Sequence, residues 1–117
     1  MSEDSLIGIR DRMREFTRQR DWERFHDPKS LALALVGEVG ELAELLQWLP
    51  SDQASRLVQS DPLHTRLGEE LSDVLIYLVR LADVCGVELP EAVGLKIDAA
   101  HARFPASEVQ GVAPEKS

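Results

Sequence analysis

The segment from Leu31 to Trp48, LALALVGEVGELAELLQW, constrains the fold of this chain more than any other part of the sequence. Its apolar residues recur at helical spacing, which predicts a core helix. The same segment nevertheless carries Glu38, Glu41 and Glu44. It also contains two glycines, each of which costs a helix interior about 1 kcal/mol relative to alanine. Two departures from local rules in one segment indicate a functional site.

The rest of the chain reads as helical, without strand alternation or an internal repeat. Asp27 followed by Pro28 is a helix start signal, and Asp61 followed by Pro62 repeats it. Gly86 is typical of a helix C-cap. The expected helices cover residues 5–20, 28–48, a short stretch from about 51 or 52, 62–85 and 90–104. We therefore expect an all-α fold, a compact four-helix bundle in one domain over residues 1–105, with a disordered tail over 106–117.

Composition narrows the function classes. The 117 residues carry a net charge of −8, which argues against binding of nucleic-acid polymers. The single cysteine, Cys85, leaves no internal disulfide and no cysteine-based zinc site. The acidic N-terminus does not resemble a signal peptide, and no apolar run approaches the roughly 20 residues that span a membrane. A cytoplasmic protein without a membrane partner is expected.

The acidic residues lie at the centre of apolar helix faces. On a helical wheel, Glu38 falls within the stripe of leucines of its helix and Glu41 lies beside it, whereas Glu44 is at the edge. In the segment GEELSDVLIYLVRLADVCG, Glu70 and Asp73 occupy the same positions, and Glu69 lies closer to the edge. Each pair is spaced by three residues, so its carboxylates lie one turn apart on one face.

Packing of these two helices would bring four carboxylates together. Unpaired buried carboxylates are unfavourable or have raised pKa values, and a divalent cation resolves both problems. All-oxygen ligands suit Mg²⁺, or Mn²⁺ in its place, rather than zinc. Because magnesium retains positions for water and phosphate oxygens, phosphoanhydride chemistry is the first hypothesis.

Two structural alternatives compete with this hypothesis. The acidic residues could be solvated or paired with arginines such as Arg66 or Arg80, which is the common role of single glutamates on helices. A ferritin-like di-iron site also uses carboxylates in a bundle, but it normally needs two Glu-x-x-His repeats. This chain has one, from Glu23 to His26. Two matched acidic pairs favour the magnesium site.

The sequence at these residues resembles a known family. EVGELAELLQW followed by EELSDVLIYLVRLA is similar to the MazG-like all-α nucleoside triphosphate pyrophosphohydrolases, in particular their dCTP pyrophosphatase branch. The likeness extends through RDWERFHDPKSLALALVGE upstream and VELPEAVGLKIDAAHARFP downstream, roughly from Ile9 to Pro105. It implies hydrolysis of a nucleoside triphosphate, such as dCTP or a modified dCTP, to the monophosphate and pyrophosphate. It further implies magnesium binding by Glu38, Glu41, Glu70 and Asp73, and a role in nucleotide-pool cleansing.

The resemblance also implies substrate contacts. Trp22, Trp48 and Tyr77 match aromatics that enclose the base, although each is also explained by ordinary packing. Lys96 matches a lysine expected near the phosphates, and Arg103 lies on the same face seven residues later. The chain departs from the branch pattern at Met13, where relatives carry histidine, and at Ala100, where they often carry asparagine. These departures put the base and sugar preference in doubt, and His26 and His101 are the available substitutes.

We expect metal-assisted hydrolysis, with Glu41 as one candidate acceptor of the attacking water's proton. The Glu70 helix is apolar on nearly every side, and this favours a homo-oligomer; the resemblance implies a dimer or a tetramer. Other substrates of the superfamily (dUTP, a damaged deoxynucleoside triphosphate or phosphoribosyl-ATP) remain alternatives. A non-enzymatic helical module that binds a metal or a nucleotide is the alternative from another class.

Overall fold

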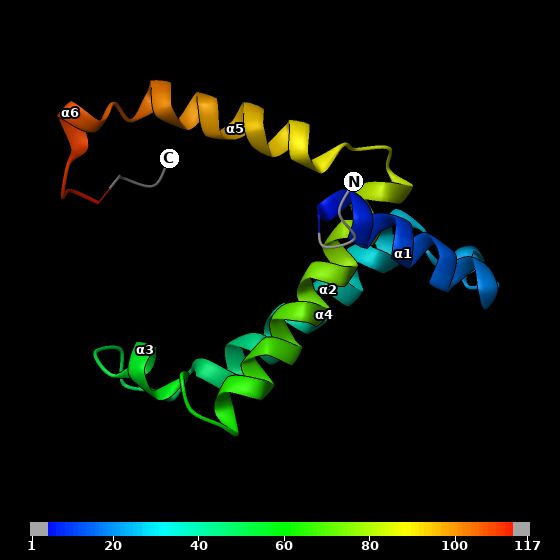
Figure 1. Cartoon of the computed structure of the whole chain (residues 1–117), viewed down its shortest axis with the longest axis horizontal. Helices are drawn as coiled ribbons and strands as arrows, with labels where there is room; N and C mark the ends of the chain where they lie inside the picture. Colours follow the sequence, from blue (N-terminus) through cyan, green and yellow to red (C-terminus); the bar gives the residue numbers. More distant parts are fainter. Residues whose placement is uncertain (1–4, 114–117) are drawn as a thin grey trace. The chain divides into compact units, whose positions relative to one another are not determined.

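The computed structural model describes residues 5–113, and every regular element in this range is a helix (Figure 1). The chain forms two compact units that divide after Gly86. The all-α prediction is therefore confirmed, and the four long helices expected from the sequence are all present. Within the described range, no helix combines the length and the apolar character that a bilayer span requires.

The first unit begins with α1 (Leu6–Gln19), which is capped by the Ser5 side chain at 3.0 Å from the Gly8 amide. Thr17 is buried, and its hydroxyl donates to the Met13 carbonyl oxygen at 2.9 Å. A short 3₁₀ helix, η1 (Glu23–Phe25), follows. It connects α1 to the helix that carries Glu38 and Glu41. Trp22 and His26 flank η1 on either side.

The acidic helix α2 (Pro28–Leu46) starts where the sequence predicts. The Asp27 carboxylate accepts a hydrogen bond from the Ser30 amide at 2.9 Å, and Pro28 occupies the first helical position. The helix ends two residues before the expected position at Trp48. Gly37 and Gly40 are exposed, and an added Cβ would meet nothing within 4 Å at either. Within the described residues of the first unit, no second helix approaches this glycine face closely.

The connection to the second acidic helix differs slightly from the prediction. The short helix α3 (Ala54–Leu57) begins two to three residues later than expected, and α4 (Leu63–Val84) begins after Pro62. Asp61 still acts as a cap because its carboxylate accepts from the Thr65 amide at 3.0 Å. Gly86 has a φ of +70°, a conformation that glycine adopts readily, and it follows Cys85, the C-cap of α4, at the predicted end of this helix.

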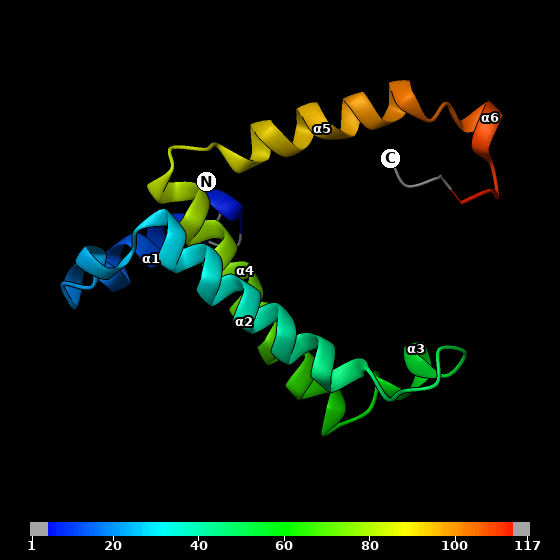
Figure 2. The ribbon, with the colours of Figure 1, turned by 180° about the vertical axis from the view of Figure 1, so that it is seen from behind.

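Helix α4 packs beside α2 in the antiparallel direction, and α1 packs against α4 near the end that approaches Gly86 (Figures 1 and 2). The most buried apolar residues are Leu31 on α2 and Val79 and Ala82 on α4. This pairing turns the acidic stripes of α2 and α4 toward each other. Large apolar side chains nevertheless remain exposed on the unit, including Leu33, Val36, Val39, Leu71 and Leu78.

The second unit contains α5 (Leu89–Arg103) and α6 (Ala106–Val109). Pro90 lies in the first turn of α5, as the sequence predicts. The tail over 106–117 was expected to be disordered, and the structure differs because residues 106–109 form a short helix. Pro105 precedes this helix, and its fixed φ favours a helix start. A helix of four residues is too short for the periodicity of apolar residues to indicate it. Residues 114–117 lie outside the described range.

Candidate active site

Three carboxylates converge between α2 and α4. One oxygen from each of Glu38, Glu41 and Glu70 lies within 4.8 Å of the others. We call these three residues the acidic cluster. Glu38 and Glu41 stand one turn apart on α2, and Glu70 reaches them from the antiparallel partner, because the two apolar stripes that carry these residues pack together. The convergence agrees with the arrangement expected from the helical wheels.

The fourth predicted ligand, Asp73, lies beside the cluster but is not one of the three whose oxygens converge. Its negative charge acts on both Glu38 and Glu70 and contributes to their raised pKa values. Asp73 also lines the same cavity as Glu38, from the opposite helix. The structure thus places all four predicted ligands in one neighbourhood, with Asp73 as the outer member.

The cluster has two oxygens that lack partners. The Oε2 atoms of Glu38 and Glu70 are buried and accept no hydrogen bond. Partial burial raises the pKa of each side chain, and the charge of Glu41 raises it further. Over residues 5–113, no ion pair involves Glu38, Glu41, Glu70 or Asp73. The alternative in which arginines neutralise these carboxylates therefore finds no ion pair to support it.

The donor set fits a hard divalent cation. Carboxylate oxygens are the ligands that Mg²⁺ and Mn²⁺ prefer, and a cation among them would offset the crowded negative charge. It would also supply a partner to the two buried oxygens, each of which is otherwise an unfavourable unpaired acceptor. Exposed acidic groups alone would not support this assignment; the buried unpaired oxygens do.

A cavity of about 360 Å³ adjoins the cluster, and we call it the aromatic cavity. Its volume falls within the range of about 300–1,000 Å³ typical of small-molecule sites. Glu38 and Asp73 form part of its wall. The remaining lining combines aromatic, apolar and polar side chains: Phe16, Trp22, Tyr77, Met13, Leu31, Ile76, Thr17, His26 and Arg80. Two of the three predicted base-binding aromatics, Trp22 and Tyr77, are therefore brought to one cavity.

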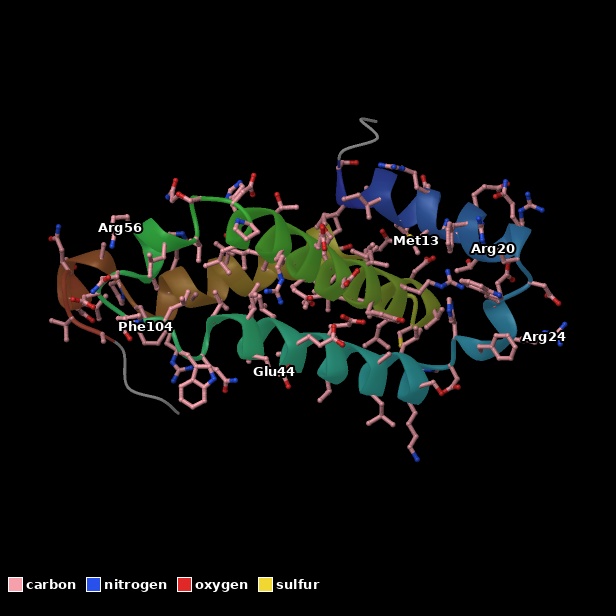
Figure 3. All side chains as sticks on the ribbon, turned by 90° about the horizontal axis from the view of Figure 1, so that it is seen from below. Met13, Arg20, Arg24, Glu44, Arg56 and Phe104 are labelled. Atoms are coloured by element: carbon pink, nitrogen blue, oxygen red, sulfur yellow. The ribbon has the colours of Figure 1, made fainter. Side chains whose placement is uncertain are left out.

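The aromatic rings Phe16 and Trp22 pack against each other at one part of the aromatic cavity. Trp22 packs edge-on against Phe16, with ring centroids 5.8 Å apart and an interplanar angle of 70°. The Arg20 guanidinium covers the Phe16 ring at 3.8 Å. Trp22 itself remains 45% exposed, so part of its surface is available to a ligand. Figure 3 shows Met13 on the side of α1 that faces α4, where it joins the lining.

Trp48, the third predicted aromatic, lies elsewhere. It is 85% exposed and lines a second, more open cavity of about 530 Å³, together with Arg66 and the cluster residues Glu41 and Glu70. We call this the acidic cavity. Trp48 follows the C-terminal end of α2, whereas the aromatic cavity is near its beginning, so the two tryptophans lie on opposite sides of the cluster. The charge of Arg66 acts to lower the pKa of Glu70, but burial and the charges of Glu41 and Asp73 outweigh it, so the pKa of Glu70 stays raised.

Lys96 and Arg103 belong to the second unit, on α5. Both side chains are exposed within it. Arg103 lies over the Phe104 ring, with its guanidinium carbon 5.0 Å from the ring centroid. Their expected contacts with phosphates stay predictions.

The sequence predicts only part of the lining of the aromatic cavity. His26 was expected as a substitute for a missing nucleotide contact, and it lines the cavity, whereas Phe16 was not predicted as a site residue. Arg80 was considered a partner for the acidic pairs, whereas it contacts His26 and Asp83 instead. The RDWERFHDP stretch, in which an aromatic and a histidine flank a short turn before a capped helix, was the available signal for this part of the cavity.

Comparisons with known proteins agree with this geometry. The model of the MazG nucleotide pyrophosphohydrolase domain matches residues 26–105. Proteins named dCTP pyrophosphatase 1 from Bos taurus and Homo sapiens are each 53% identical over 104 residues, or 89% of this chain. The chain spans about three fifths of their length, 62% and 61% respectively.

A solved structure agrees as well. The crystal structure of a pyrophosphatase from Archaeoglobus fulgidus DSM 4304 superposes with a TM-score of 0.74 at 38% sequence identity. The match covers 81% of this chain and 87% of that protein. The resemblance noted from the motifs is thereby confirmed. The chain belongs to the MazG nucleotide pyrophosphohydrolase family.

Proposed function

We propose that this protein hydrolyses a deoxynucleoside triphosphate, dCTP or a modified dCTP, to the nucleoside monophosphate and pyrophosphate. The observation that carries the proposal is the pair of buried, unpartnered oxygens of Glu38 and Glu70, of which Glu38 lines the aromatic cavity and Glu70 the acidic cavity. The names of the curated relatives support the choice of dCTP. The metal ligands would be Glu38, Glu41, Glu70 and Asp73, and the cofactor would be Mg²⁺ or Mn²⁺.

The two cavities suggest how a nucleotide would lie. The aromatic cavity would receive the base, because Trp22 offers a ring face that can stack with a flat heterocycle. The triphosphate would then extend past Glu38 and Asp73 toward the acidic cavity. Arg66, which lines that cavity beside Glu41 and Glu70, would provide a positive charge for the departing pyrophosphate.

The chemistry divides between the bound metal and the side chains. Mg²⁺, when bound, supplies charge neutralisation at the phosphate oxygens during phosphoryl transfer. The carboxylates would hold the ion in a fixed place, because they lie on two packed helices. Glu41 is the exposed member of the cluster, and we assign to it the acceptance of the proton from the attacking water. We further propose that the protein is a homo-oligomer, since Leu33, Val36 and Leu71 remain exposed on one unit.

A substrate panel with two matched variants tests the base site. Pyrophosphate release would be measured for canonical and modified nucleoside triphosphates with the wild type, Trp22→Leu and Phe25→Leu. Phe25 is the control because it lies on the same turn, is 63% exposed and is not part of the cavity lining. Loss of stacking should raise KM about tenfold in Trp22→Leu, since stacking on a base contributes roughly 1–3 kcal/mol.

Phe25→Leu should retain the wild-type KM. Equal KM values in the two variants would contradict the assignment of the base to the aromatic cavity. A preference for dUTP, a damaged deoxynucleoside triphosphate or phosphoribosyl-ATP over dCTP would retain the catalytic proposal and change the substrate.

A further inference from the structure

Arg80 is a buried cation on α4 that forms the centre of a polar chain. Only 7% of the residue is exposed. Its Nη1 lies 3.2 Å from Asp83 Oδ2, and its Nε donates to His26 Nδ1 at 3.0 Å. Asp83 in turn accepts two hydrogen bonds from Arg14 on α1, from Nε at 2.8 Å and from Nη2 at 2.6 Å. These contacts thus run from α1 through α4 to His26, the residue that follows η1.

The chemistry of arginine determines the state of His26. A guanidinium has only donors and does not lose its proton in proteins, so His26 Nδ1 must act as the acceptor. The single ring proton of His26 is then on Nε2, and the ring is neutral. Burial and the positive charge of Arg80 both lower the pKa of His26, against a raising effect from Glu23. The geometry and the charges therefore favour the same neutral form.

His26 and Arg80 both line the aromatic cavity. We propose that Arg80, anchored by Asp83, positions His26 as the neutral Nε2–H tautomer, so that the aromatic cavity carries a fixed hydrogen-bond donor for an acceptor atom of the bound nucleotide. The positioning step stands on the contacts alone, whereas the nucleotide contact rests on the proposed function. The role differs from that of the acidic cluster, which Arg80 does not contact as an ion-pair partner.

Charged groups on every neighbouring element bear on this arrangement. Arg80 and Asp83 belong to α4, Arg14 to α1 and Glu23 to η1. Glu38 from α2 and Asp73 from α4 share the cavity wall. Among these, Arg80 makes the direct hydrogen bond to the ring, and its charge opposes a second proton there. A fixed neutral donor discriminates between ligands better than a ring that can change its tautomer, because an analogue lacking the acceptor leaves the donor unpaired.

A purely structural role is the competing explanation, since the Arg14–Asp83 pair ties α1 to α4. The two roles separate by variant. Arg14→Leu removes the tie between the helices but leaves Asp83 and Arg80 in contact. Arg80→Leu removes the donor to His26 and leaves Asp83 paired with Arg14. Only the second variant should alter the histidine.

The first test is spectroscopic and needs no substrate. Long-range ¹H–¹⁵N correlation spectra of the metal-loaded full chain, assigned with a His26→Gln spectrum, report the tautomer of His26. We expect an unprotonated Nδ1 and a protonated Nε2 at pH 7 in the wild type and in Arg14→Leu. Arg80→Leu should show a mixture of tautomers and a His26 pKa that rises toward the ordinary 6.5. A wild-type ring protonated on Nδ1, or the same tautomer in Arg80→Leu, would overturn the inference.

The second test is kinetic. KM for the best nucleotide of the panel should rise about three- to tenfold in Arg80→Leu, the range expected for one neutral hydrogen bond, with kcat nearly retained. Arg14→Leu should lose thermal stability and keep its KM. An equal KM in both variants would refute the nucleotide contact. If Arg80→Leu does not fold, Arg80→Gln replaces it, since its amide can donate to Nδ1 without charge and should retain the tautomer while raising the His26 pKa.

Failure of this inference and failure of the proposed function give different results. A protein that hydrolyses no nucleotide but shows the expected tautomer would refute the proposed function and the nucleotide contact while leaving the positioning role of Arg80 intact. A protein that hydrolyses dCTP with the wrong tautomer, or with an unchanged tautomer in Arg80→Leu, would refute the role of Arg80 alone.

Discussion

Replacement of Glu38 by glutamine should stabilise the metal-free protein and weaken its response to Mg²⁺. Burial and the neighbouring charges of Glu41, Asp73 and Glu70 raise the pKa of Glu38 above 4.5 in the folded state. Between pH 4.5 and this raised pKa, Glu38 keeps its proton in the folded state and loses it in the unfolded state. The free energy of unfolding therefore decreases as the pH rises through the folded-state pKa of Glu38. At pH 7 the Glu38 carboxylate opposes folding, whereas the amide of similar shape does not carry this charge.

The metal response gives the expected magnitude. At a Mg²⁺ concentration of 100 times Kd, binding stabilises the wild type by about 2.7 kcal/mol. Even changes outside the first coordination shell weaken metal binding roughly tenfold or more, and a tenfold weaker variant gains only about 1.4 kcal/mol at the same concentration. For a unit of about 60–100 residues these values correspond to Tm increases of roughly 11–22 °C and 6–11 °C.

Thermal melts followed by circular dichroism at pH 7, in EDTA and in Mg²⁺, measure both effects. Glu69→Gln is the matched control, since it removes the same charge from an exposed position on α4 outside the acidic cluster. The control should show the wild-type response to Mg²⁺. A lower Tm for Glu38→Gln in EDTA, or a Mg²⁺ shift equal to that of the wild type, would refute the reasoning about the cluster.

Three further predictions concern stability. In EDTA, the free energy of unfolding of the wild type should decrease as the pH rises from about 4.5, because Glu38 and Glu70 have raised pKa values in the folded state; urea titrations that show an increase would contradict this. Gly40→Ala should stabilise the protein by about 1 kcal/mol in chemical unfolding, since an added Cβ meets nothing within 4 Å. A loss of stability, together with a loss of the oligomer in sedimentation, would instead place the Gly40 face in a subunit contact. Leu31→Ala should destabilise the protein by about 2–5 kcal/mol in chemical unfolding, and a loss below 1 kcal/mol would show that Leu31 is not part of a close-packed core.

Local patterns were sufficient for the parts of the fold that local physics determines. The helical period of the apolar residues, the Asp27 cap and the glycine at position 86 predict α2 and the end of α4 because each acts within one turn of its own helix. The acidic cluster was also predictable, since both acidic pairs lie within apolar stripes and the packing of these stripes brings their carboxylates together. The outer position of Asp73 required the actual packing distance between α2 and α4.

The polar part of the aromatic cavity depends on contacts that sequence spacing does not encode. His26 and Arg80 are 54 residues apart, and their hydrogen bond forms only because η1 brings His26 against the buried face of α4. Trp22 and Trp48 illustrate the same limit. Both looked like base-stacking residues, but the length of α2 separates them, and only Trp22 reaches the aromatic cavity.

The most direct test of the central claim is product analysis of dCTP by ³¹P NMR with the wild type and Glu38→Gln, in Mg²⁺ and in EDTA. The proposed function predicts stoichiometric dCMP and pyrophosphate from the wild type in Mg²⁺, and no products in EDTA or from Glu38→Gln. Release of inorganic phosphate with dCDP, or no turnover of any nucleoside triphosphate by folded protein with bound Mg²⁺, would contradict it.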